Sequence, residues 1–454
     1  MIAYKKRQNR RLWLAGAILV FLFFGSGAEA VEAQEAGFPY PLSRFKLRNG
    51  LEVIVCEDSS VPLISVVVTY AVGSINDPEN KAGLAFMMQH LMFQGSQNVG
   101  PMQHLMYIQN AGGELNASTT FDKTFFYETV PSNQLSLVLW LESDRMNSLE
   151  INEAKIARIK ELMLANEQQR SLQEPYARYF FLMDQILYPD FSYGHSPLGT
   201  VDNLNSITVD DVLAFYRRYY VPNNAVLCIS GDIKAQKARE LISKYFETIP
   251  RGAEPPSYPQ PDFSDVYSSR DQTIVDPLVS TPALEFGLRL EEPLSEERPA
   301  LRLFEYLLIN GKSSRLYKLL VSRERVALYL SGNLEDRRSF MSLKLFLLAN
   351  NQIMIDRSKK LIVDELNKFK LELVSDRELV RAKNKYRFDF LSQLTTTNLD
   401  RSLALSEFYL RWGQLPDINY ELAAVNKITP YSILSLSRKY LQEGKYCFVT
   451  ILPR

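Results

Sequence analysis

The sequence predicts an α+β fold of two homologous domains, each a sheet with helices packed on one face. Runs with strand composition and then amphipathic helices occur in the same order in both halves of the 454-residue chain. Residues 250–270 separate the halves and include prolines at positions 250, 255, 256, 259 and 261. This composition favours an extended linker over a helix or a central strand. The similar order of elements in the two halves indicates a duplicated domain. A solenoid would instead repeat every 20 to 50 residues, roughly a tenth of this chain.

In the first half, two runs rich in β-branched residues predict the strands Leu51–Asp58 and Leu63–Ser74. The predicted helix Thr208–Tyr219 has a threonine at its N-cap and two aspartates in its first turn, and both features stabilise a helix start. The other elements predicted here are the helix Gly83–Phe93, the strand Phe125–Thr129 that Pro131 ends, the helix Ile156–Arg170 and a strand within Asn224–Asp232.

The second half repeats this order. Strand composition over Thr273–Asp276 and Ala283–Glu291 precedes the predicted helix Ala300–Ile309. Apolar residues recur in this helix at steps of three and four residues, as expected for one buried face. A helix followed by a strand, both within Tyr431–Pro453, ends the half. The predicted domains are therefore residues 31–249 and 271–454.

Residues 1–30 have the pattern of a secretory signal peptide. Five basic residues from Lys5 to Arg11 precede the apolar run Leu12–Phe24, and a small-residue cleavage site, A-E-A, follows at residues 28–30. The apolar run has thirteen residues, which is short for a membrane span. An uncleaved anchor is the alternative, and it would be the only predicted contact with a membrane. The pattern predicts a periplasmic or secreted protein.

Charge and cysteine content narrow the function classes. Without residues 1–30 the chain has 47 Lys and Arg against 51 Asp and Glu, a net charge of −4. Because there is no basic excess, we expect no nucleic-acid partner. Cys56, Cys228 and Cys447 lie in apolar runs with strand composition. Buried free thiols are the expectation, and one disulfide with one remaining thiol is the alternative.

The predicted helix Gly83–Phe93 carries the residues that bear on function. Phe86, Gln89 and His90 are three and four residues apart, so they share one helix face. With His, Glu and His at these positions, two imidazoles would bind zinc and a carboxylate would activate water. Phenylalanine offers no ligand, and an amide does not act as a general base. The alternative for His90 is a hydrogen-bonded, partly buried histidine.

This arrangement resembles the H-x-x-E-H zinc motif of the pitrilysin/insulinase (inverzincin) peptidases. Further runs resemble motifs of that family in order and spacing, namely Gly112–Pro131, Leu139–Met146, Phe215–Asp232 and Gly311–Leu320. The resemblance covers residues 44–454 and is closest to the short, two-domain bacterial members and the subunits of mitochondrial processing peptidase. It implies that the third zinc ligand of active members, a helical Glu, corresponds to Glu167, 77 residues after His90.

The resemblance also implies substrate-binding residues. Asn116, Ala117 and Thr119 lie where the resemblance implies that the strand from Thr119 to Thr129 is an open sheet edge, to which an extended peptide adds as a further strand. The alternative for Gly112–Asn116 is a hairpin or turn that enters a strand. Tyr329 corresponds to a substrate-binding tyrosine of the C-terminal domain. The matching arginine position falls on Ser322, and Arg323 is one residue later, which rotates a helical side chain by about 100°. A solvated helix end is the alternative for Arg323.

The predicted function is therefore that of a non-catalytic subunit of a heteromeric zinc metallopeptidase. The chain itself is expected to hold no cofactor, although active members of the family hold zinc. Its expected partners are a zinc-bearing homologous subunit and an extended peptide or unfolded protein. Two alternatives remain: an active zinc endopeptidase with a remodelled site, and a peptide-binding or assembly protein without a peptidase partner.

Overall fold

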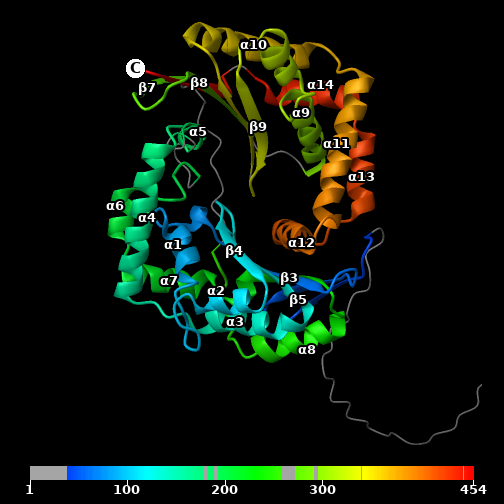
Figure 1. Ribbon diagram of the computed structural model, residues 1–454. Helices are drawn as coiled ribbons and strands as arrows, with labels where there is room; N and C mark the ends of the chain where they lie inside the picture. Colours follow the sequence, from blue (N-terminus) through cyan, green and yellow to red (C-terminus); the bar gives the residue numbers. More distant parts are fainter. Residues whose placement is uncertain are drawn as a thin grey trace, which may run out of the picture.

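Two sheets with helices on their outer faces build the protein (Figure 1). The computed structural model describes residues 38–256, 271–290 and 295–454, apart from residues 177, 178, 180, 189–192, 339 and 443. The predicted signal peptide and most of the predicted linker lie outside the described residues. None of the described helices is long and apolar enough to cross a membrane.

The first sheet belongs to the first half of the chain. Its strands, in chain order, are β1 (Leu42–Lys46), β2 (Glu52–Glu57), β3 (Leu63–Tyr70), β4 (Glu114–Thr119), β5 (Thr124–Pro131) and β6 (Ala225–Gly231). They lie side by side in the order β1-β2-β6-β3-β5-β4. The helices of this half are α1 (Leu84–Leu91), α2 (Gln103–Asn110), α3 (Leu135–Ser148), α4 (Glu153–Gln173), α5 (Leu182–Leu187), α6 (Val201–Ser206), α7 (Val209–Tyr219) and α8 (Ala235–Phe246).

The second sheet has five strands in the order β7-β11-β8-β10-β9. Their bounds are β7 (Gln272–Val275), β8 (Ala283–Leu290), β9 (Tyr329–Asp336), β10 (Met341–Leu348) and β11 (Tyr446–Leu452). The helices are α9 (Arg298–Leu308), α10 (Gln352–Leu371), α11 (Asp376–Thr395), α12 (Asn398–Trp412), α13 (Ile418–Lys427) and α14 (Pro430–Tyr440), with a π-helix over Tyr317–Arg323.

Apart from the additional strand β1 of the first, the two sheets have the same topology. β2 pairs with β6 in parallel, as β7 pairs with β11, and every further neighbour pair is antiparallel in both sheets. The edge strands β4 and β9 therefore occupy equivalent places, and so do helices α1 and α9 and helices α4 and α11. This confirms the predicted α+β fold of two homologous halves. The exact domain boundaries stay a prediction.

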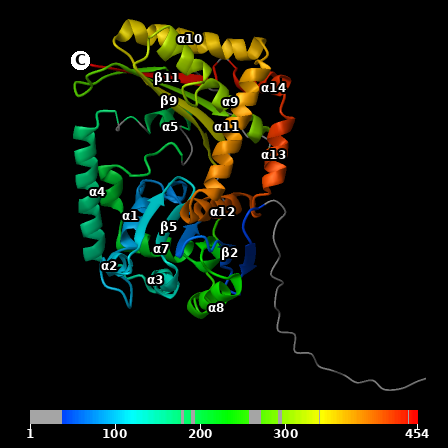
Figure 2. The ribbon, with the colours of Figure 1, turned by 45° about the vertical axis from the view of Figure 1, so that its right-hand side comes forward.

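One helix of each half packs against the sheet of the other half. Helix α12 of the second half lies across β3 and β6 of the first sheet, and helix α5 of the first half lies against β8 of the second (Figures 1 and 2). Apolar side chains make both contacts. One hydrophobic cluster contains Leu405 of α12 with Ile54 and Val67 of the first sheet, and another contains Met183 of α5 with Val449 of the second. Since α5 and α12 follow α4 and α11 in chain order, the exchange is reciprocal.

A charged contact reinforces this junction. Arg337, just after β9, donates to Asp184 of α5 at 2.8 Å and lies 3.9 Å above the ring of Phe121. Lys344 donates to the same Asp184 carboxylate at 2.6 Å. A carboxylate buried between two cations is compensated only while the halves stay together. The junction therefore fixes the spacing of the two sheets.

The cysteines are free and buried, as expected. Cys56 and Cys228 lie in the first sheet beneath α12, and Cys447 lies in the second sheet with its Sγ 3.5 Å from the Sδ of Met183. The disulfide alternative is therefore wrong for these thiols. Burial raises the pKa of Cys56 and of Cys447 to about 12, so both remain protonated and unreactive at neutral pH.

Two strand predictions need correction. The strand predicted to run to Ser74 ends at Tyr70, where the chain turns toward a short 3-10 helix, Ser74–Asn76. The strand interpreted as one open edge from Thr119 to Thr129 is a hairpin, in which β4 is the edge and β5 is internal.

Candidate functional site

Helix α1 holds the degenerate motif in a fixed position. It begins after Gly83, whose φ of 95° is in the left-handed region and whose Cβ position would meet the carbonyl oxygen of Leu198 at 2.7 Å, so only glycine fits. The buried carboxylate of Asp77 accepts hydrogen bonds from the N–H groups of Gly83 and Ala85, both at 2.8 Å. Asp77 thus satisfies orphan donors at the helix start.

The phenylalanine that replaces the first histidine packs on the histidine that remains. The rings of Phe86 and His90 meet edge to face, with centroids 4.8 Å apart. Within the described part of the chain, the buried Nε2 of His90 has no hydrogen-bond partner. Burial lowers the pKa of His90, so the imidazole is neutral at neutral pH. His90 is therefore chemically able to bind a metal, but an aromatic ring lies beside it where a ligand would be needed.

Gln89, at the position of the general base, contacts the edge strand. Its Nε2 donates to the carbonyl oxygen of Ala117 at 3.3 Å. The N–H of Ala117 donates to the Oδ1 of Asn116 at 2.8 Å. At the hairpin end the N–H of Thr120 donates to the carbonyl oxygen of Lys123, which fixes the alternation of hydrogen-bonded pairs along β4 and β5. Ala117 and Phe126 are therefore a non-hydrogen-bonded pair, so the N–H and C=O of Ala117 point to the free edge. Side chains therefore satisfy both free-edge groups of Ala117, as in protected sheet edges.

Substituting Gln89 tests whether this contact competes with peptide binding. In Gln89→Leu the carbonyl of Ala117 loses its side-chain donor, and the affinity for an extended peptide should rise about threefold to tenfold, the worth of one hydrogen bond. Fluorescence anisotropy with a labelled unfolded peptide measures the change. The matched control is Gln109→Leu on the exposed face of α2. Equal affinities in both variants would argue that the β4 edge is not where peptide binds.

The residues near His90 do not fit a zinc ion. Helix α4, which carries Glu167, packs against α1, and the Oε2 of Glu167 is buried. A protein zinc site needs three or four N, O or S ligands. Among the described residues, only His104, Glu128 and Glu142 form a group of three ligand-type side chains whose atoms lie within 4.8 Å of one another, and His90 is not part of it. His90 and Glu167 therefore lack the ligand that Phe86 replaces.

The group of His104, Glu128 and Glu142 is a buried charge cluster beneath the first sheet. Nε2 of His104 on α2 lies 3.1 Å from Oε1 of Glu128 on β5. Arg145 on α3 pairs with Glu142 one helical turn before it and reaches Glu128 at 3.4 Å. Its guanidinium also lies 4.2 Å above the centre of the Phe126 ring. A cation thus already occupies the space between the carboxylates, and a metal ion would have to displace it.

The cluster has a definite charge state at neutral pH. Burial, with a smaller contribution from Arg145, lowers the pKa of His104 to about 3, so the imidazole is neutral. Burial raises the pKa of Glu142 to about 8, and the charge of Glu128 also raises it, so Glu142 is protonated. Burial also raises the pKa of Glu128, and Arg145 opposes this shift, so Arg145 is the cation that stabilises the charged form of Glu128. Sequence reasoning missed this cluster; charged residues three apart in the apolar run LWLESDRM were the signal.

These shifts predict a pH dependence of stability. The neutral His104 stabilises the fold above pH 6.5, and this contribution is lost as the pH falls toward 3. The protonated Glu142 stabilises it below pH 4.5, and this contribution is lost as the pH rises through 8. Between pH 4.5 and 6.5 the two slopes cancel. Above that range we expect wild type to lose up to about 1.4 kcal/mol per pH unit relative to Glu142→Gln, in urea unfolding series. Parallel curves would contradict the assignment.

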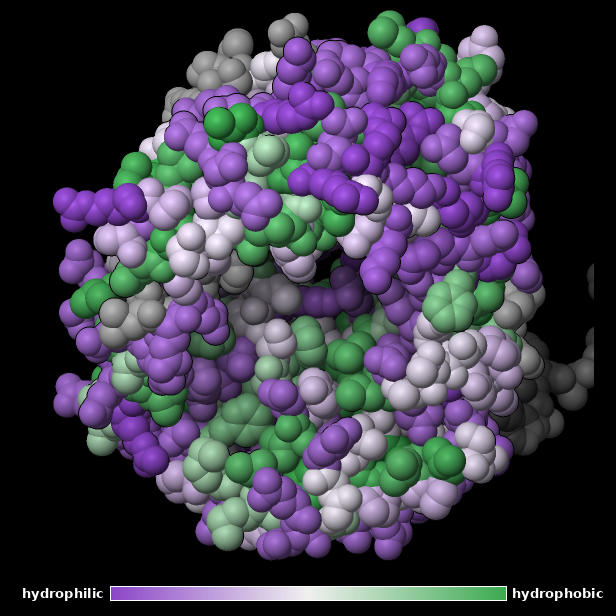
Figure 3. All heavy atoms as spheres, turned by 45° about the horizontal axis from the view of Figure 1, so that its top comes forward, coloured by the Kyte–Doolittle hydropathy of each residue, from purple (hydrophilic) through white to green (hydrophobic). Residues whose placement is uncertain are grey.

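A cavity of about 930 Å³ lies between the two halves. Its walls are the end of β4 with Ser118, the β4–β5 turn with Phe121, the edge strand β9 with Ser331 and Asn333, and charged residues of the junction such as Lys344. The surface is hollowed at this place (Figure 3). The equivalent edges of the two sheets therefore border one cavity, as peptide binding between them would require.

None of the predicted binding residues is part of this cavity's lining. Arg323 ends the π-helix, is exposed and pairs with Glu324 at 3.2 Å. Tyr329 begins β9, is 51% exposed and lies edge-on to Phe346, a lining residue. Asn116 is exposed on β4, while Thr119 is half-buried at its end. His104 belongs to the charge cluster, and Nε2 of His195 lies 3.8 Å from Asp77, so neither approaches a ligand role beside His90.

Comparison with known families and proteins agrees with the two-domain fold. Residues 53–190 match the family model described as insulinase (peptidase family M16), and residues 206–386 match the one described as the peptidase M16 inactive domain. The zinc protease PqqE of Helicobacter pylori is 28% identical over 359 residues, which are 78% of this chain and 80% of that protein. The beta subunit of bovine mitochondrial-processing peptidase is 27% identical over 243 residues, 52% of this chain and 49% of that protein.

The fold comparison extends over nearly the whole described chain. The crystal structure of a protease from Helicobacter pylori superposes with a TM-score of 0.84 at 24% identity, covering 91% of this chain and all of that one. At this identity the likeness concerns the fold alone. With both halves matched in sequence and in structure, the chain belongs to the insulinase, or pitrilysin, family of peptidases (peptidase family M16).

Proposed function

We propose that this protein is the non-catalytic subunit of a heteromeric zinc metallopeptidase and that it encloses extended peptide for a zinc-bearing homologous partner. The observation that carries the proposal is the contact of Phe86 with His90, with the Gln89 amide bonded to the edge strand. This arrangement offers neither the ligands nor the base that zinc hydrolysis needs. The chain keeps the elements for binding peptide and lacks those for cutting it.

The cavity between the halves supports a binding role. It is of the size of ordinary ligand sites, at about 930 Å³, and the edge strands β4 and β9 both border it. An extended peptide can add to such an edge through main-chain hydrogen bonds, and on β4 it would displace the Gln89 amide and the Asn116 side chain from Ala117. Arg323 and Tyr329 are exposed and lie outside the lining, so they are placed to reach a peptide held by another subunit. The mature protein would act in the periplasm or outside the cell, on the signal-like pattern of residues 1–30.

Co-purification and activity together test the proposal. The full chain, isolated from its native cells under mild conditions, should retain a homologue that contains H-x-x-E-H. The chain alone should not cleave a quenched-fluorescent unfolded peptide, whereas the complex should do so in a zinc-dependent way. Tyr329→Phe and Arg323→Gln should slow the complex without preventing its assembly, while Arg377→Gln on the exposed face of α11 serves as the matched control.

The outcomes separate the competing functions. Zinc-dependent cleavage by the chain alone would mean an active peptidase with a remodelled site. Peptide binding without any peptidase partner would mean a peptide-binding or assembly protein. Either result would overturn the proposal.

A further inference from the structure

The second half contains a groove at the place equivalent to the degenerate metal site. In the first half, α1 carries the motif and α4 packs beside it; in the second, α9 and α11 occupy these places in chain order and in packing. The groove runs between α9, α11, α12, α13 and α14 and has a volume of about 970 Å³. This is within the usual size of small-ligand sites.

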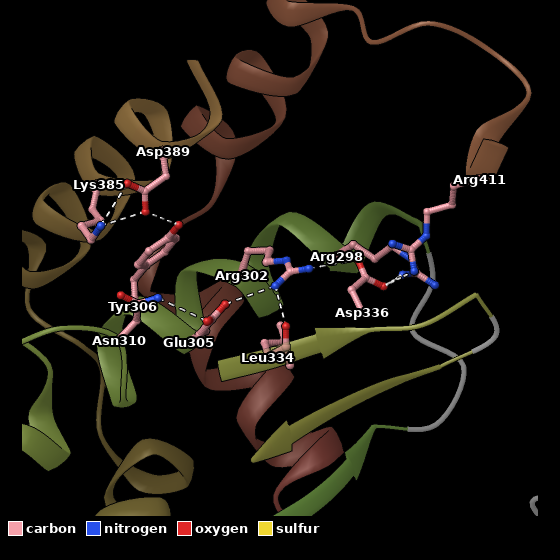
Figure 4. Close-up of polar contacts among 10 residues, drawn as sticks. All are labelled: Arg298, Arg302, Glu305, Tyr306, Asn310, Leu334, Asp336, Lys385, Asp389 and Arg411. Carbon is pink, nitrogen blue, oxygen red and sulfur yellow. Dashed lines mark hydrogen bonds and ion pairs between the residues drawn. The ribbon is translucent and has the colours of Figure 1, made fainter. Parts of the chain in front are cut away.

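One end of the groove is an arginine cluster built on a single aspartate (Figure 4). Arg298 and Arg302 come from α9, and Arg411 comes from the end of α12, the helix that lies across the first sheet. Arg298 and Arg411 pair with Oδ1 of Asp336, the latter at 2.6 Å, and Arg302 lies 3.4 Å from Oδ2. Arg302 also pairs with Glu305 at 3.3 Å. Three guanidinium groups thus surround the carboxylates of Asp336 and Glu305, and the charge of Glu407 also acts on Arg411.

The hydrogen-bonding capacity of Arg411 is not fully used. Its side chain is 16% exposed, and its buried Nε has no hydrogen-bond partner within the described residues. Burial lowers the pKa of Arg411, and the neighbouring charge of Arg298 lowers it as well. An anion placed between these two guanidinium groups would offset both effects.

Several aromatic rings line the groove beside and beyond the arginines. Arg298 and Arg411 lie 5.2 and 5.5 Å from the centre of the Trp412 ring. Farther along, the rings of Tyr386 and Phe390 stack at 5.9 Å, and both line the groove. Beyond the arginines, Tyr306 donates to Asp389 at 2.7 Å, and Lys385 pairs with that same carboxylate, so this end carries no surplus charge (Figure 4). Guanidinium planes over aromatic faces are well suited to bind a planar anion joined to an apolar body.

We propose that this groove binds a ligand with one carboxylate next to an aromatic or large apolar group, held by Arg298, Arg302 and Arg411. A monoanion would pair with these arginines while adding the least negative charge to the groove. A dianion such as phosphate would meet Asp336 and Glu407, which also line the groove. The carboxylate can belong to a free acid or to the C-terminus of a peptide, and both share the recognised chemistry. Because Asp336, Glu407 and Arg411 also line the cavity between the halves, the bound ligand would contact the wall of that cavity.

Binding to the full chain alone tests this site, without a partner or cleavage. The probes are N-acetylphenylalanine, its amide, a short peptide ending in phenylalanine with a free carboxylate, and the same peptide amidated. Titration calorimetry should give saturable binding for at least one acid and none for either amide. Binding of both acids identifies a free acid as a sufficient ligand, whereas binding of the peptide acid alone identifies a peptide C-terminus. Absence of binding by both acids, or equal binding by an amide, overturns the proposal.

Two variants locate the site. Arg298→Gln should weaken binding about tenfold or more, the usual worth of a charge-assisted hydrogen bond. Ala424→Phe should block binding by filling the groove while leaving every arginine in place. Arg377→Gln, which removes the same charge from an exposed site on α11, should bind as wild type does. Circular dichroism confirms folding of each variant. Unchanged binding in folded Ala424→Phe would exclude the groove.

Discussion

The double substitution Phe86→His and Gln89→Glu is expected to create a zinc site. The two changes supply the imidazole and the carboxylate that the motif lacks, beside a neutral His90 and a helix α4 that already packs against α1. Two imidazoles and Glu167 would complete a three-ligand site with water in the fourth position. Calorimetry should show one zinc ion bound with a Kd of about 1 µM or less, against no saturable binding at this site in wild type.

A third substitution provides the control for this result. Adding Glu167→Gln to the double variant should weaken zinc binding by about a hundredfold, if Glu167 is the third ligand. Polar groups placed where Phe86 packs will cost about 1–3 kcal/mol, so the stability of each variant is measured in parallel. A folded double variant that binds no zinc would show that α4 holds Glu167 beyond ligand reach.

Removal of Arg145 is expected to cause the largest loss of stability. Arg145→Met leaves Glu128 buried without its cation, since the neutral His104 and the protonated Glu142 supply no charge. Breaking a buried pair in this way costs about 3–5 kcal/mol. Urea unfolding at pH 7, followed by tryptophan fluorescence, should show the loss as a lower midpoint.

The control variants separate charge from packing. Adding Glu128→Gln to Arg145→Met should recover part of the loss, because the uncompensated charge is removed. Lower pH should also help the single variant, since Glu128 then becomes protonated, and its pKa is already raised by burial. Arg217→Met on the exposed surface of α7 should stay within about 0.5 kcal/mol of wild type. A loss that neither lower pH nor the second substitution reduces would point to packing as the cause.

Local patterns in the sequence predicted most of the strands but left out many helices, among them α2, α8 and α10 to α13. The helix Thr208–Tyr219 is α7 with Thr208 as its cap, and the Ala300–Ile309 periodicity is α9 apart from its first turn. These elements depend on capping and on apolar spacing, which are properties of neighbouring residues. The hairpin at residues 119–124 was missed because the break between β4 and β5 has no glycine or proline to mark it.

The sequence by itself also determined what the motif cannot do, because a hydrocarbon ring binds no metal and an amide is no base, whatever their surroundings. Only the tertiary structure decided what these side chains do instead: Phe86 packs on His90, and Gln89 satisfies Ala117 on the edge strand. It also decided the Arg145 cluster and the arginine groove. The members of each lie on different helices and strands, and only packing places their side chains in contact. Helices α2 and α3 meet strand β5 beneath the first sheet, and the end of α12 meets α9 at the end of β9.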